Sequence, residues 1–120
     1  MTDYMIQFGD IFLAELVGDG HTQGGIRPVI IVQNNIGNLH APTTEVIPLS
    51  ARTNKASYMP THVTITPTEE NGLNHASVAV AEQTTTIDKR RLKRRLGAVD
   101  HGTLIRIGHA RRIQSPFPTE

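Results

Sequence analysis

Short apolar runs, separated by polar and glycine-rich segments, fill the first two thirds of the chain. The run from Val29 to Val32 is continuous and rich in β-branched residues, which is typical of a central strand. Residues 62–66 alternate between polar and apolar positions, as a half-buried strand does. Asparagine and glycine over residues 34–38 predict a turn or loop. The whole pattern predicts strands over residues 11–17, 29–32, 45–50, 62–66 and 77–83, with Pro48 indicating an edge strand or a bulge.

The pattern changes near residue 88, where helical features replace strand features. Asp88 is a typical N-cap residue, and Leu92 and Leu96 would share one face of a helix that ends at Gly97. A second helix is expected from Asp100 through residue 112. The proline-rich residues 114–120 are expected to form a flexible tail. Strands first and helices last predict an antiparallel α+β fold, in a single domain over residues 1–120.

Composition narrows the classes of protein. A chain of 120 residues suits one compact domain with one core. The absence of cysteine excludes disulfides and thiolate metal sites. No apolar stretch approaches the roughly 18 residues of a transmembrane helix, and the N-terminus lacks a basic-then-apolar signal. We therefore expect a cytoplasmic protein with no membrane partner.

The charge of the chain is unevenly distributed. The formal net charge is only +1, from 12 basic and 11 acidic residues. Residues 88–95 alone carry six basic residues and one acidic residue, which leaves six basic and ten acidic residues for all other positions. Such a basic segment either binds RNA or an acidic protein tail, or it is a solvated helix face.

A glycine-rich loop delivers one arginine to the start of the second strand. The segment runs Gln23-Gly24-Gly25-Ile26-Arg27-Pro28 and enters the apolar run at Val29. Glycines allow the backbone to approach a ligand closely or to take a positive φ. An arginine offers a fixed fork of donors suited to phosphate. Local chemistry leaves two interpretations, namely a phosphate-binding loop or a turn that carries a surface arginine.

Several segments together resemble one known family. They are Gly9–Ala14, Gln23–Val29, Gln33–Asn38, Pro60–Val63 and Glu82–Leu92. In this order and spacing they resemble the MazF/PemK/Kid toxin endoribonucleases of type II toxin–antitoxin systems, particularly the Gram-positive, EndoA-like MazF branch. The resemblance covers about residues 8 to 110. It implies a strongly twisted, antiparallel, SH3-like small barrel of the CcdB/PemK kind, with C-terminal helices, paired as a homodimer.

The resemblance also implies a reaction and its residues. The activity would be sequence-specific, metal-independent cleavage of single-stranded RNA, with no cofactor, leaving a 2′,3′-cyclic phosphate or 3′-phosphate and a 5′-hydroxyl. The arginine of the Gln-Gly-Gly-X-Arg-Pro motif is catalytic in the family, and Arg27 matches it. The family's second catalytic position is a threonine at the end of the third strand, where this chain has Ser50. Serine keeps the hydroxyl that can donate to a phosphate oxygen.

One departure concerns the loop before the glycines. Many family members have an acidic residue directly before the Gln-Gly pair, whereas this chain has His21 and Thr22 there. His21 has an ordinary pKa suited to general-base catalysis, so it is a candidate substitute, although a loop histidine can also be simply exposed. His62 is expected to be a structural strand residue, and the histidine spacings do not indicate zinc.

Gln83 resembles the residue with which the family reads a base. Its amide can donate and accept at once, as hydrogen bonding to an unstacked base requires, although it could instead pair with backbone. The expected RNA-binding set is His21, Thr22, Gln23, Gly24, Gly25 and Gln83. A cognate antitoxin with an acidic, disordered tail would occupy the same groove. Two alternatives stay open, namely a non-enzymatic CcdB-like toxin that binds DNA gyrase and a plain RNA-binding module.

Overall fold

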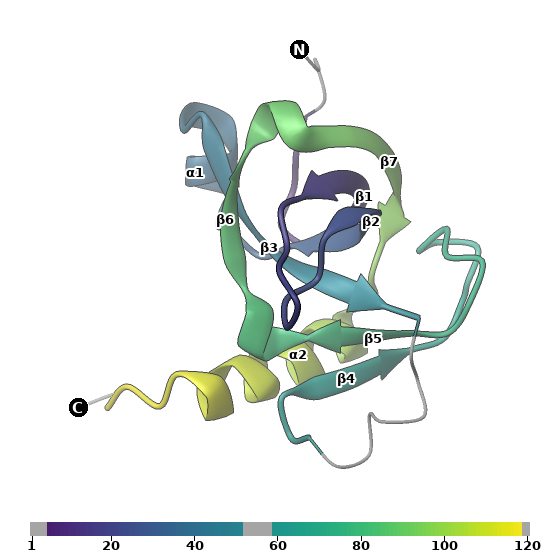
Figure 1. The fold of residues 1–120 in the computed structure, drawn as a ribbon, viewed down its shortest axis with the longest axis vertical. Coiled ribbons are helices and arrows are strands. Elements are labelled where there is room, and N and C mark those ends of the chain that lie inside the picture. Colours follow the sequence, from purple (N-terminus) through teal and green to yellow (C-terminus); the bar gives the residue numbers. More distant parts are fainter. Residues whose placement is uncertain (1–4, 52–58, 119–120) are drawn as a thin grey trace.

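One seven-stranded antiparallel sheet carries most of the secondary structure (Figure 1). The computed structural model describes residues 5–51 and 59–118. Along the sheet the strands follow the order β4-β5-β3-β2-β1-β7, and β6 pairs with β3 beside that path. The strands are β1 (Asp10–Leu16), β2 (Gly25–Ile31), β3 (Thr43–Ser50), β4 (His62–Ile65), β5 (Ser77–Val80), β6 (Thr85–Asp88) and β7 (Leu92–Ala98). The helices are α1 (Asn35–His40), α2 (His101–Gln114) and the 3-10 turns η2 (Ala81–Gln83) and η3 (Lys89–Arg91).

Strand β3 is the pivot of the sheet. One edge pairs with β2, while the other pairs first with β6 over Thr43–Val46 and then with β5 over Leu49 and Ser50. Pro48, expected at an edge or a bulge, is instead buried in this central strand. Pro48 lies between the segment of β3 that pairs with β6 and the segment that pairs with β5. The strand therefore changes its partner around a proline, which has no backbone N–H to donate.

The two faces of the sheet bury two separate apolar clusters, because successive strand residues point to opposite faces. The helix-side cluster lies against α2 and includes Ile11, Ile30, Ile47, Leu49, Ile107 and Ala110. The hairpin-side cluster fills the space enclosed by β6, η3 and β7, which curl around the β1–β2 hairpin (Figure 1). Its members include Phe12, Leu16, Val29, Val46, Ile87 and Leu92.

The final helix forms where it was predicted. Asp100 caps α2 by accepting a hydrogen bond from the backbone N–H of Thr103 at 2.8 Å. The helix packs against β4 and η2 (Figure 1), with Ile107 and Ala110 buried. No helix in the described part of the chain is long and apolar enough to cross a membrane. Beyond Gln114 the described residues leave the helix, and the flexibility of the tail stays a prediction.

The helix predicted over residues 88–96 is wrong. Asp88 does act as a cap, but for the 3-10 turn η3, after which the chain continues as strand β7. Leu92 enters the hairpin-side cluster and Leu96 packs against the helix-side cluster, so they do not share one face. Pairing with β1 outweighs the local i, i+4 spacing, which is weak information without tertiary context.

Other differences are smaller. The predicted loop at residues 34–38 contains the short helix α1, capped by Asn34, and the predicted strand 77–83 ends at Val80 before η2. The antiparallel α+β class is confirmed. The sheet is not closed into a barrel, since among the described residues β4 and β7 form the two ends of the strand path, and one C-terminal α-helix is present there rather than several.

Candidate active site

The glycines of the β1–β2 loop have specific conformational tasks. A Cβ on Gly18 would lie 2.7 Å from the backbone of Gln23, and one on Gly24 would lie 2.9 Å from the backbone nitrogen of Gly18. Gly25 has a φ of +77°, a conformation that residues with side chains rarely adopt. The loop therefore closes on itself through glycine contacts and then turns sharply into β2, two residues before Arg27.

Arg27 is held at the base of this loop. It pairs across the sheet with Ala14 of β1 and is half-buried. Its Nε donates to the carbonyl oxygen of Gly24 at 2.9 Å, and its Nη1 donates to Oε1 of Gln23. These two bonds fix the direction of the guanidinium while leaving its other N–H donors for a ligand.

Ser50 lies at the end of the strand next to Arg27. It is the last residue of β3, pairs with Val78 of β5 and is 8% exposed. The last β2–β3 pair joins Val29 to Pro48. Arg27 lies two residues before Val29, and Ser50 lies two residues after Pro48. Because antiparallel partners run in opposite directions, continuing this register would set Arg27 opposite Ser50. The fold thus brings both predicted catalytic residues to the same pair of strand ends.

Gln83 joins this group from a distant part of the sequence. Its Oε1 accepts a hydrogen bond from the backbone N–H of Gln23 at 2.7 Å, and its Nε2 lies 3.3 Å from the carbonyl oxygen of His21. Gln23 in turn accepts from Arg27, so a chain of hydrogen bonds connects η2 to β2. A pocket of about 180 Å³ is lined by Gln23, Ser50, His62, Val78, Val80, Glu82 and Gln83.

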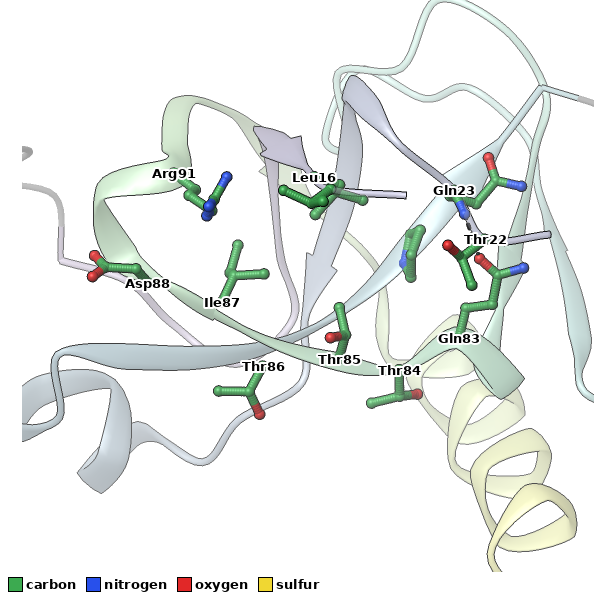
Figure 2. Close-up of a pocket in the computed structure, with 12 residues that line it drawn as sticks. Leu16, Thr22, Gln23, Gln83, Thr84, Thr85, Thr86, Ile87, Asp88 and Arg91 are labelled. Atoms are coloured by element: carbon green, nitrogen blue, oxygen red, sulfur yellow. Dashed lines mark hydrogen bonds between the residues drawn. The ribbon is translucent and has the colours of Figure 1, made fainter. Parts of the chain in front are cut away.

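A larger cleft opens beside this pocket (Figure 2). It has a volume of about 440 Å³, with Gln23 and Gln83 at one end and Asp88 and Arg91 at the other. Thr84, Thr85 and Thr86 form a row of side chains along β6 between the two ends. The cleft combines amide, hydroxyl, guanidinium and carboxylate groups with the apolar side chains of Leu16, Val17 and Ile87.

His21 and Thr22 have different surroundings from the rest of the predicted set. Thr22 belongs to a turn built on Asp19, whose carboxylate accepts from the backbone N–H groups of His21 and Thr22. These bonds and one from the Thr22 hydroxyl lower the pKa of Asp19. Asp19 is therefore ionised but occupied by its own loop. Thr22 lines the larger cleft, and His21 is exposed.

No pattern in the sequence indicates the pairing of His62 with Glu82. Nε2 of His62 lies 2.8 Å from Oε2 of Glu82, and the Thr61 hydroxyl donates to Oε1 at 2.7 Å. Partial burial raises the pKa of Glu82, but the bonds from Thr61 and His62 outweigh that effect and lower it overall. Since Glu82 precedes Gln83, this group anchors η2 to β4. His62 also lines the small pocket, so its structural role stays a prediction, and the Pro-Thr-His-Val motif gave no sign of its partner.

The predicted basic segment is divided among several environments. Lys89 is buried, and its Nζ donates to the carbonyl oxygen of Asn38. Arg90, Lys93 and Arg95 form ion pairs with Asp88, Glu15 and Asp10, respectively. The residues form a 3-10 turn and an edge strand, not the helix face that was one interpretation. Within residues 5–51 and 59–118, no group of three or more His, Asp or Glu side chains could hold a metal ion.

Comparison with solved structures supports the fold. The chain is similar to MazF of Deinococcus radiodurans, with 20% identity, a TM-score of 0.81 and coverage of 96% of this chain and 100% of that chain. It is also similar to the Mycobacterium tuberculosis toxin MazF-mt6, with 23% identity, a TM-score of 0.75 and coverage of 91% and 98%. A mycobacterial endoribonuclease solved with its cognate antitoxin matches at 24% identity, with a TM-score of 0.74 and coverage of 96% and 99%. At these identities the likeness shows the fold alone.

Family membership rests on a separate comparison. The model of the family described as PemK-like, MazF-like toxin of type II toxin–antitoxin system matches residues 7–114. That range includes the glycine loop, Arg27, Ser50 and Gln83. The match does not distinguish the Gram-positive, EndoA-like branch, which stays a prediction. The chain belongs to the PemK-like, MazF-like toxins of type II toxin–antitoxin systems.

Proposed function

We propose that this chain is a sequence-specific endoribonuclease that cleaves single-stranded RNA without a metal ion. The observation that supports this most is the convergence of Arg27 and Ser50 at neighbouring strand ends, beside the pocket that Gln23 and Gln83 line. A cationic donor, a hydroxyl and two amides in one place suit a phosphodiester between unstacked bases. One of the similar mycobacterial structures is itself described as an endoribonuclease.

Arg27 has the central chemical role in this proposal. The ribose 2′-oxygen attacks the neighbouring phosphorus, the 5′-oxygen of the next nucleotide leaves, and negative charge accumulates on the phosphoryl oxygens between these events. A guanidinium already directed by Gly24 and Gln23 stabilises that charge without reorganising. Ser50 donates to a phosphoryl oxygen and orients the phosphate. The products are a 2′,3′-cyclic phosphate or 3′-phosphate and a 5′-hydroxyl.

Proton transfer requires a base for the 2′-hydroxyl and an acid for the leaving oxygen. We assign protonation of the leaving oxygen to Arg27. We assign the base to His21, because Asp19 is occupied by three loop donors and the acid of other family members is missing before Gln23. An unchanged pH–rate profile in His21→Ala would remove the histidine from the mechanism.

Base recognition is assigned to the two glutamines and the loop. Gln83 lines both the small pocket and the larger cleft. Its Oε1 and Nε2 pair with the backbone of Gln23 and His21, the alternative that the sequence left open, and its second N–H and second lone pair are what we assign to a base. Such an amide reads the edge of a splayed base, as single-stranded RNA recognition requires. His21, Thr22, Gly24 and Gly25 complete the RNA-binding surface through the loop that they form.

Two protein partners follow from the family. A toxin of a type II pair has a cognate antitoxin, and a similar mycobacterial structure was solved with one. We propose that an acidic, disordered antitoxin tail binds over the same cleft and blocks RNA. We also propose that the active form is a homodimer.

The decisive test is a digest of a long single-stranded RNA in EDTA by wild type and Arg27→Ala. We expect wild-type fragments that share one short motif, carry 5′-hydroxyl ends and are absent with the variant. Circular dichroism and thermal unfolding establish that the variant is folded. Intact RNA with wild type would contradict the proposal and would direct attention to a protein target such as gyrase.

A further inference from the structure

A second cleft lies on the other side of Arg27. It has a volume of about 410 Å³ and shares no lining residue with the pocket and cleft that contain the two glutamines. Its lining combines aliphatic residues with Asn74, His75, Arg27 and Arg94. Arg27 links the two regions, because it lines this cleft while its guanidinium donates to Gln23 in the other.

The pairing of the strands explains why Leu13, Pro28 and Arg94 share one cleft. Arg94 of β7 pairs with Leu13 of β1, and Leu13 pairs with Pro28 of β2. Partners in register direct their side chains to the same face of a sheet. With strands about 4.8 Å apart, Arg94 lies two strands from Pro28, the neighbour of Arg27. Arg27 precedes Pro28 and would point to the opposite face in a regular strand, so the strand pairing alone does not bring the two arginines together. What links them is that both line this cleft.

Two irregularities in β7 adjust the position of Arg94. The β1–β7 register shifts between Ile11 and Phe12 and again between Leu13 and Ala14, so Arg94 and Arg95 pair between two bulges. Bulges bend a strand and change the direction of its side chains. Arg95 is directed to Asp10, with Nη2 to Oδ1 at 3.1 Å, whereas Arg94 lines the cleft.

The loop before β5 closes the opposite wall of the cleft. Gly72 has a φ of +68°, and a Cβ there would lie 2.1 Å from the carbonyl oxygen of Leu96. A Cβ on Gly97 would lie 2.1 Å from the carbonyl oxygen of Glu70. The loop and β7 are therefore in backbone contact, which fixes Asn74 and His75 at the rim.

The charged residues that line the cleft are arginines. No carboxylate is among its lining residues, and the exposed guanidinium of Arg94 has no hydrogen bond or ion pair among the residues that the structure describes. Its neighbours Lys93 and Arg95 are paired with acids. An unpaired guanidinium over an aliphatic floor favours a ligand with an anionic group and an apolar body.

We propose that this cleft binds the nucleotide next to the scissile phosphate, with Arg94 holding its phosphate and the ribose and base packing over Leu13 and Pro28. This inference rests on the proposed endoribonuclease function. It extends the RNA path from the glutamine pocket, past Arg27, to β7. A single strand threaded in this way contacts Arg27 at the cleaved bond and Arg94 at the next phosphate.

The test compares Arg94→Gln with Lys93→Gln, which removes the same charge from the adjacent residue of β7, outside the cleft. Binding of a 2′-O-methyl oligonucleotide that contains the cleavage motif is measured by fluorescence anisotropy between low and moderate salt. We expect Arg94→Gln to weaken binding about fivefold to tenfold and to reduce the slope of log K against log salt by about 0.7, the contribution of one single-strand phosphate. Lys93→Gln is expected to change neither, and Arg94→Lys to restore the slope.

The outcomes separate this inference from the proposed function. Wild type must first cleave the unmodified oligonucleotide, and a failure there overturns both. If wild type cleaves and Arg94→Gln binds RNA as wild type does, the cleft is not a nucleotide site and the nuclease stands. Equal slopes of log K against log salt for Arg94→Gln and Lys93→Gln would also overturn the inference. The inference would also be overturned if Arg94→Gln lost binding to an acidic peptide while its binding to RNA stayed unchanged.

Discussion

At the scale of single residues, the arrangement of Arg27 depends on the loop that precedes it. Two acceptors, the Gly24 carbonyl and Gln23 Oε1, direct the guanidinium, and Gln83 holds the backbone of Gln23. A side chain that is oriented before substrate arrives loses little freedom during reaction. The glutamines therefore orient Arg27, in addition to the base recognition that we propose for them.

The positive φ of Gly25 gives the first prediction. An alanine there keeps the backbone in a left-handed conformation at a cost of about 1 to 2 kcal/mol of stability. No other atom lies within 4 Å of the added Cβ, so conformational strain is the whole effect. Urea denaturation of Gly25→Ala measures it. Gly20→Ala is the control, since that Cβ also meets nothing and φ is not positive. Equal stability of the two variants would contradict this account of the loop.

Some of the site could be predicted from sequence, for physical reasons. Arg27 and the glycines are consecutive, so their relation is local and visible as a motif. The bond from Gln23 to Gln83 joins residues 60 positions apart, and only the fold brings them together. The same holds for Glu82 and His62, whose pairing depends on the turn of η2 against β4. A pattern of residue types carries no information on such contacts.

At the scale of elements, the strands were predictable and the β7 region was not. Alternating or continuous apolar runs decide which residues are buried in a sheet, so the strands predicted at residues 11–17, 45–50 and 62–66 lie close to their observed bounds. The strand predicted at residues 29–32 begins four residues earlier, at Gly25, and includes Arg27. Residues 88–96 contain two leucines at helical spacing and many good helix formers. From Leu92 onward they form a strand because β1 offers an unpaired edge, a condition that the segment itself does not reveal.

The cap of η3 gives a prediction with pH. The side-chain hydrogen bond from Arg90, followed by its backbone N–H, lowers the pKa of Asp88 from 3.8 to about 2. Because the folded pKa lies below the unfolded value, the cap contributes stability above pH 3.8 and loses it as the pH falls towards about 2. The difference in urea midpoint between wild type and Asp88→Asn should be constant above about pH 5 and shrink below 3.8.

The control for the cap is Glu69→Gln, an exposed loop substitution that is expected to leave the midpoint unchanged at each pH. A wild-type advantage over Asp88→Asn that persists unchanged down to pH 2 would show that the carboxylate charge has no part in the cap.

At the scale of the whole molecule, the site is assembled from three separate segments. The β1–β2 loop supplies Gln23 and Arg27, the end of β3 supplies Ser50, and η2 supplies Gln83. The central strand β3, which pairs with three other strands, places these segments together. Unfolding of the sheet therefore separates all three segments of the site at once.

The assembly state is a further prediction at this scale. We expect a homodimer, and sedimentation equilibrium should give a mass twice the 13.2 kDa of one chain. The exposed apolar residues Ile105 and Ile113 of α2 are one surface that such pairing would cover. A single species at the monomer mass, with RNA cleavage retained, would contradict the dimer as the active form.

The central claim is that Arg27 and Ser50 act on one phosphate, and a double-mutant cycle tests it most directly. Single-turnover cleavage of one oligonucleotide is measured for wild type, Arg27→Lys, Ser50→Ala and the double variant. Each single substitution should slow cleavage by about tenfold or more. The rate loss of the double variant should be much smaller than the product of the two single rate losses, because the effects of residues that act as a unit are not additive. Effects that multiply, or a wild-type rate in either single variant, would contradict the shared site.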